Sequence, residues 1–190
     1  MSRLPKSAVS VAMQRAQHRQ WVLKPQDLVV ALKLYLLGAE PWSYASLASS
    51  MHLSGFEAHA AVQRLLAARL AVEVDGRIRT VVASLRAFLV RGAPYAYPPV
   101  RGVVTIGVPT AHAAPPLLGG SPIADDLPPV WPDPEGSIRG QALLPLYPGA
   151  VRAALEDSAL YAMLALFDAL RGGQAREREL AGRLLEERLV

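Results

Sequence analysis

The arrangement of this chain follows from residues 43–81, which read SYASLASSMHLSGFEAHAAVQRLLAARLAVEVDGRIRTV. Apolar residues in the first half recur at three- and four-residue steps, which predicts one helix over 43–52 and another from 56 to about 69. Ser43 is the expected N-cap of the first of these helices, and Ser54 or Gly55 that of the second. The gap between the two helices is short, which is the spacing of a helix-turn-helix.

Two further elements flank these helices. Pro25 and Asp27 open an upstream amphipathic helix, because proline suits the first turn and a carboxylate complements the positive end of the helix dipole. Gly38 is its expected end. Downstream, the segments on both sides of Asp75-Gly76 alternate in polarity, which predicts a β-hairpin.

After the hairpin, Ser84 is expected to cap a short helix over 85–90 that ends at Gly92. Three helices followed by a hairpin is the element order of a winged helix-turn-helix. We therefore predict a mainly α fold: a winged helix-turn-helix with a small β-hairpin wing, a Pro-rich extended segment and C-terminal helices.

The Pro-rich segment is the most unusual part of the chain, since residues 93–148 hold 13 of the 16 prolines. Tyr, Trp, Val and Ile are interleaved with these prolines, which favours ordered extended structure with short strands near 103–108 and 137–142. The predicted organisation is a basic N-terminal arm (1–21), a winged helix-turn-helix domain (22–92), the extended segment (93–148) and a C-terminal helical region (149–190).

The C-terminal region carries a strong apolar stripe, interrupted by Gly172-Gly173 and followed by a charged helix over 175–189. The stripe comprises Ala153, Leu155, Leu160, Met163, Leu164, Phe167 and Leu170. We expect it to form a homodimer interface, as terminal helices often do; the alternative is that it folds back on the core of its own subunit.

Composition restricts the function classes. The chain of 190 residues is 52% hydrophobic and has no cysteine, which excludes disulfides and cysteine-based zinc sites. Residues 1–100 carry 12 Lys and Arg against 5 Asp and Glu, so this half suggests a polyanionic partner. No apolar run approaches the roughly 20 residues of a membrane span, and the N-terminus lacks the apolar core of a signal peptide. We expect a cytoplasmic protein with no membrane partner.

The helix-turn-helix stretch resembles winged-helix bacterial transcriptional regulators, most closely the MarR-like superfamily, over about residues 25–82. The resemblance rests on Leu47-Ala48, Leu53-Ser54, Val62 and Arg64-Leu65. It implies that the third helix enters the major groove of double-stranded DNA and that the wing contacts the backbone.

Transferred to this chain, the resemblance gives a set of candidate DNA contacts: Ser54, Phe56, Glu57, His59, Gln63 and Arg64 on the third helix, and Arg77 and Arg79 on the wing. Gln63 can pair with adenine and Arg64 with guanine, although Arg64 can instead pair with Glu57 or Glu73. Arg77 and Arg79 lie on one face of their strand and suit phosphates.

No residue pattern indicates catalysis, a cofactor or a metal. His52 and His59 have only Glu57 nearby as a further metal ligand. The group His112, Asp125, Asp126, Asp133 and Glu135 has no spacing typical of an active site. The alternative to a DNA-binding regulator is a protein-interaction module, such as an antitoxin whose Pro-rich segment wraps a partner protein.

Overall fold

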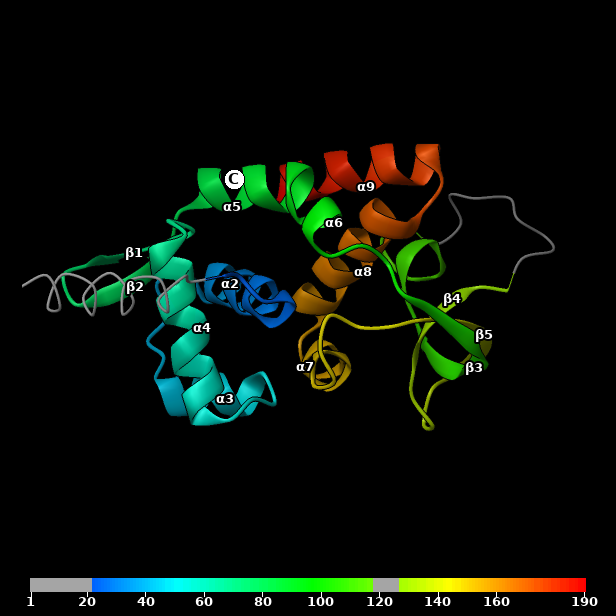
Figure 1. Ribbon diagram of the computed structural model, residues 1–190, viewed down its shortest axis with the longest axis horizontal. Coiled ribbons are helices and arrows are strands. Elements are labelled where there is room, and N and C mark those ends of the chain that lie inside the picture. Colours follow the sequence, from blue (N-terminus) through cyan, green and yellow to red (C-terminus); the bar gives the residue numbers. More distant parts are fainter. Residues whose placement is uncertain (1–21, 118–126) are drawn as a thin grey trace, which may run out of the picture.

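The computed structural model describes residues 22–117 and 127–190, and in this part the protein has eight α-helices and five short strands (Figure 1). The predicted basic arm lies outside the described residues. The elements are α2 (Pro25–Leu37), α3 (Tyr44–Ser50), α4 (Gly55–Ala67), β1 (Ala71–Val74), β2 (Arg77–Thr80), α5 (Val82–Arg91), α6 (Ala93–Ala96), β3 (Arg101–Pro109), the 3-10 turn η1 (Ala111–Ala113), β4 (Pro129–Pro132), β5 (Ile138–Leu143), α7 (Ala150–Glu156), α8 (Ser158–Gly172) and α9 (Ala175–Arg188). The fold is mainly α, as predicted.

The first three described helices begin where their caps were expected. The Ser43 side chain accepts a hydrogen bond from the backbone N–H of Ser46 at 3.1 Å, and Ser54 accepts one from Glu57 at 3.2 Å. Gly38 follows α2 with φ of +57°, a conformation that glycine adopts without strain. One prediction was wrong: α5 begins at Val82, so Ser84 lies inside the helix and does not cap it.

The predicted hairpin is formed by β1 and β2, which pair antiparallel with Val72 opposite Arg79 and Val74 opposite Arg77. Residues directly opposite share a face of the ladder, so these four side chains lie together. The other face holds Ala71, which is buried.

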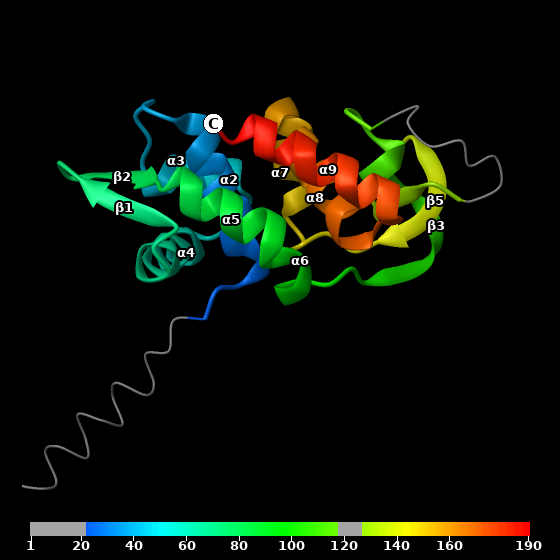
Figure 2. The same ribbon diagram turned by 90° about the horizontal axis from the view of Figure 1, so that it is seen from above.

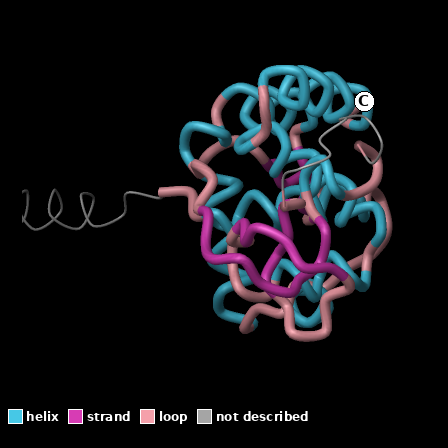
Figure 3. The backbone as a smooth tube through the Cα atoms, turned by 90° about the vertical axis from the view of Figure 1, so that its right-hand side faces the viewer, coloured by secondary structure: helices cyan, strands magenta, loops and turns pink. Residues whose placement is uncertain are grey.

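The Pro-rich segment forms a second small sheet. The predicted strands near 103–108 and 137–142 are present as β3 and β5, while β4 was not foreseen. Each strand pairs with both others, so the sheet closes on itself; Figure 3 shows these strands in front of the helices. Glycine permits this closeness: a Cβ on Gly107 would collide with the Trp131 carbonyl, and one on Gly140 with the Pro128 carbonyl.

One hydrophobic core runs from α2 to α9, with α8 near its centre. Leu160, Met163, Leu166 and Phe167 are fully or almost fully buried within this chain. The C-terminal apolar stripe is therefore largely covered by its own subunit, the alternative weighed against a dimer interface. Because these side chains are already buried within one chain, the stripe does not support pairing of two copies. Leu155, near the start of the stripe, is an exception and is 58% exposed.

The two ends of the molecule carry different elements. Figures 1 and 2 place the β1–β2 hairpin at one end and the β3–β5 sheet at the other, with α5 and α9 lying along one side between them. Polar contacts join the two halves: Tyr147 donates a hydrogen bond to the Met51 carbonyl at 2.6 Å, and Lys33 pairs with Asp157 at 2.8 Å. None of the described helices is long and apolar enough to cross a bilayer.

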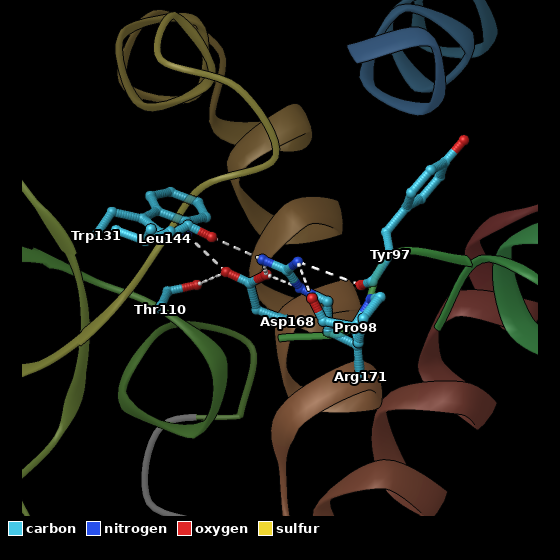
Figure 4. Close-up of polar contacts among 7 residues, drawn as sticks. All are labelled: Tyr97, Pro98, Thr110, Trp131, Leu144, Asp168 and Arg171. Atoms are coloured by element: carbon cyan, nitrogen blue, oxygen red, sulfur yellow. Dashed lines mark hydrogen bonds and ion pairs between the residues drawn. The ribbon is translucent and has the colours of Figure 1, made fainter. Parts of the chain in front are cut away.

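A buried polar cluster attaches the second sheet to α8 (Figure 4). The Asp168 carboxylate accepts hydrogen bonds from Thr110 at 2.7 Å and from the Trp131 indole at 2.6 Å, and it pairs with Arg171 at 2.8 Å. Burial raises the pKa of Asp168, while the surrounding donors oppose that rise. Its hydrogen-bonding capacity is used within the fold, which makes this a structural cluster.

Arg171 extends the same cluster to the loops that flank the sheet. Its guanidinium donates to the backbone carbonyls of Tyr97 at 3.3 Å and Leu144 at 2.9 Å. One arginine therefore joins α8 to the chain both before β3 and after β5.

Candidate nucleic-acid interface

The exposed side of α4 faces away from the core. Ala58, Ala61, Val62 and Leu65 are fully buried, and the helix packs mainly on α2, α3 and β1. On the opposite side Phe56 is 82% exposed, His59 is exposed and Gln63 is half-buried. The β3–β5 sheet lies at the other end of the molecule from α4 (Figure 1).

Arg64 was wrongly expected on this exposed face. Its residue surface is only 8% exposed, and its Nε and Nη2 atoms donate to the two carboxylate oxygens of the fully buried Asp27, each at 2.6 Å. The expected alternatives, Glu57 and Glu73, are not its partners. Because both guanidinium contacts are directed into the core toward α2, Arg64 is a structural residue and is removed from the set of DNA contacts.

Ser54 and Glu57 are occupied by capping at the start of α4. The Glu57 carboxylate accepts hydrogen bonds from the Ser54 hydroxyl at 2.7 Å and from its backbone N–H at 3.0 Å. These bonds lower the pKa of Glu57, so it stays negatively charged at neutral pH. Both residues are exposed, but their polar atoms already have partners.

The hairpin presents Arg77 and Arg79 to solvent on the face that they share with Val72 and Val74. Within residues 22–117 and 127–190, neither arginine takes part in an ion pair; the pairs present are Lys33–Asp157, His52–Glu156, Arg64–Asp27, His112–Glu177 and Arg171–Asp168. Two unpaired guanidinium groups are therefore available to an anion from outside the described chain.

A hollow of about 370 Å³ connects the wing to α4. Its lining brings Gln63 together with Arg77 and Arg79, three residues that the sequence proposed separately. It also contains two aromatic residues that sequence reasoning did not select, Trp42 and Tyr44. They flank the Ser43 cap, and nothing in that local pattern indicates that their rings line a cavity.

The rings form a short aromatic series. The Trp42 and Tyr44 centroids are 5.4 Å apart at an interplanar angle of 85°, and the Tyr44 and His59 centroids are 4.9 Å apart. Tyr44 thus joins the hollow to the exposed side of α4. His52, by contrast, points to α7 and pairs with Glu156 at 3.0 Å, so the two histidines do not come together.

The residues that the sequence considered for other chemistry remain dispersed. His112 pairs with Glu177 on α9 at 3.2 Å, beside a second hollow of about 370 Å³, and Asp133 accepts a hydrogen bond from the backbone of Glu135 at 2.9 Å. Asp125 and Asp126 lie outside the described residues. In the part of the chain that the structure describes, no three His, Asp or Glu side chains are close enough to hold a metal ion.

Comparison of the chain with protein-family models, curated proteins and solved structures finds no match.

Proposed function

We propose that residues 25–80 act as a winged helix-turn-helix that binds double-stranded DNA, and that the protein is a transcriptional regulator. One observation supports this most: Gln63 of α4 borders the same hollow as Arg77 and Arg79, two arginines that have no ion-pair partner among the described residues. In this arrangement α4 enters the major groove while the hairpin lies against the phosphate backbone.

The chemistry of the side chains assigns different contacts to α4 and to the hairpin. The Gln63 amide can make a bidentate pair with adenine, which contributes about 1–3 kcal/mol of discrimination. Arg77 and Arg79 neutralise phosphates and contribute affinity that is independent of sequence. With Arg64 buried, Gln63 carries most of the base reading expected of α4.

Salt dependence tests the proposal. Binding of the full chain to duplex DNA should weaken steeply between about 50 and 200 mM salt, because condensed counterions are released on binding. The double variant Arg77→Ala plus Arg79→Ala should lower the slope of log affinity against log salt by about two, one for each lost phosphate contact.

The matched control removes two exposed arginines of α9, Arg176→Ala plus Arg183→Ala, and should leave that slope unchanged. Equal slopes for the two double variants would refute the role of the hairpin. Absence of any salt-sensitive binding by the unmodified chain would refute the DNA-binding function.

Exposed apolar residues on β3, in the second sheet, favour an alternative function, that of a protein-interaction module. Val103 is 81% exposed and Ile106 is 50% exposed on β3, and Tyr95 before it is 85% exposed. Val103 and Ile106 are large apolar side chains exposed on a single strand, which is typical of a surface that contacts another protein. This alternative is favoured if duplex DNA fails to bind while Val103→Ser plus Ile106→Ser reduces binding of a dye specific for apolar surface.

A further inference from the structure

The hollow between the hairpin and the α2–α3 loop has a lining suited to a nucleotide. Its lining residues include the aromatic Trp42 and Tyr44, the amide-bearing Gln63 and the basic Arg77 and Arg79. Aromatic rings beside cations are the usual means of holding an unpaired nucleotide, since its base has a face that stacks on a ring and its phosphate pairs with a cation.

The size of the hollow sets what can enter. Its volume of about 370 Å³ lies at the small end of ordinary ligand sites, which suits one base with its sugar but not a base pair. A base inside an intact duplex is stacked on both faces and is not free to enter a hollow of this size. The occupant must therefore be unpaired or turned out of the helix.

The rings are held in a fixed arrangement before anything binds. Both are half-buried and pack against the core, and they meet edge to face at 85°. A base that stacks on the face of one ring is therefore nearly perpendicular to the other ring. Because these side chains are already ordered, little conformational entropy is lost on binding.

The polar lining supplies further recognition. Glu40 and Glu73 are exposed at the hollow, and their carboxylates can accept hydrogen bonds from the exocyclic amino group of a base. They also offset the positive charge of Arg77 and Arg79, so the hollow is not a general anion site. This balance favours a ligand with both an amino-bearing base and a phosphate.

We propose that this hollow binds one unpaired nucleotide of the DNA, with the base stacked on the ring of Trp42 and nearly perpendicular to that of Tyr44, its edge bonded to Gln63, and its phosphate at Arg77 and Arg79. The inference rests on the DNA-binding function proposed above and adds a preference for a duplex that contains an unpaired nucleotide.

Two DNA probes test it with the full chain: a fully paired duplex, and the same duplex with one unpaired adenosine. The second should bind more tightly, and Trp42→Ala should weaken its binding about tenfold or more, the usual effect of losing one aromatic stacking partner. Binding of the paired duplex should change less than about twofold. Trp42→Phe should retain most of the preference, because a ring remains.

A matched control and a spectroscopic signal separate stacking from general damage. Tyr95→Ala removes a ring that is 85% exposed and outside the hollow, and should alter neither probe. The unpaired probe should also quench tryptophan emission in the unmodified chain, and Trp42→Phe should remove that quenching. If Trp42→Ala does not fold, two other variants test the site. Trp42→Phe should abolish the quenching, and Gln63→Ala should weaken binding of the unpaired probe.

The outcomes are distinct. Equal affinity for the two probes, without quenching that depends on Trp42, overturns the nucleotide site and leaves the proposed duplex binding intact. Failure of both probes to bind overturns both proposals. Free deoxyadenosine monophosphate is the third probe. If it quenches Trp42 emission while the duplex with the unpaired adenosine binds no more tightly than the paired duplex, the hollow binds free nucleotides, and the proposal that its ligand is part of the DNA is overturned.

Discussion

Replacing Arg64 with alanine tests whether this arginine stabilises the core instead of contacting DNA. The side chain crosses from α4 to α2, where its two hydrogen bonds of 2.6 Å hold the carboxylate of Asp27. Asp27 has no exposed surface, so Arg64→Ala leaves a negative charge in the core without its cation.

The expected loss of stability is large. Removing one partner of a buried ion pair generally costs about 3–5 kcal/mol. The backbone N–H of Lys24 still donates to Asp27 at 2.8 Å, which favours the lower end of that range. A loss of about 3 kcal/mol lowers the urea midpoint by about 1–3 M for a small protein, with the slope of the transition unchanged.

Equilibrium unfolding in urea measures this loss of stability, and two further variants serve as comparisons. Arg64→Ala combined with Asp27→Asn removes the buried charge and should recover stability relative to the single variant, giving a coupling of at least about 1 kcal/mol. Arg183→Ala, an exposed arginine of α9, should change stability by less than about 0.5 kcal/mol. A loss below about 1 kcal/mol for Arg64→Ala, with no coupling to Asp27, would refute a structural role.

Three more predictions concern the second half of the chain. Asp168→Ala should cost about 3–5 kcal/mol in urea unfolding, because Arg171 is left without its buried carboxylate; a cost comparable to that of an exposed substitution would contradict this. Gly140→Ala should lower stability by about 1–3 kcal/mol, because the added methyl group collides with the Pro128 carbonyl in the closed sheet. An unchanged melting temperature would contradict the close packing of these strands. Partial burial alone would raise the pKa of Asp157, but hydrogen bonds from Lys33 and from the backbone at the start of α8 hold it below its ordinary value of 3.8. A lowered pKa stabilises the fold above 3.8 and loses that contribution as the pH falls through the value in the folded state, so Asp157→Asn should flatten the decline of stability in acid; identical pH profiles would disprove the pairing.

Local chemistry was enough to predict most of the first half of the fold. Ser43 and Ser54 cap helices through bonds to residues three positions ahead, and Asp75-Gly76 reverses the chain within two residues. Such signals act between residues that are close in the sequence, so they can be recognised without knowledge of the rest of the structure. The strands β3 and β5 were also foreseen from their composition, although prolines stand close to both of them.

Long-range contacts decided what the sequence could not. Arg64 has the same exposed-looking pattern as Gln63, yet its partner Asp27 is 37 residues away, and burial of both charges became visible only when α4 was packed on α2. β4 is a four-residue strand that contains two prolines, and it exists because β3 and β5 supply its neighbours.

The candidate site divides in the same way. The residue types that suit nucleic acid, Gln63 with Arg77 and Arg79, were determined by the sequence through helical period and strand alternation. That they share a hollow with Trp42 and Tyr44 was decided by the tertiary structure, because these two residues stand at the start of α3, 19 or more residues earlier in the chain than Gln63. Periodicity assigns a side chain to a face of its own helix or strand, whereas the packing of separate elements determines which faces meet.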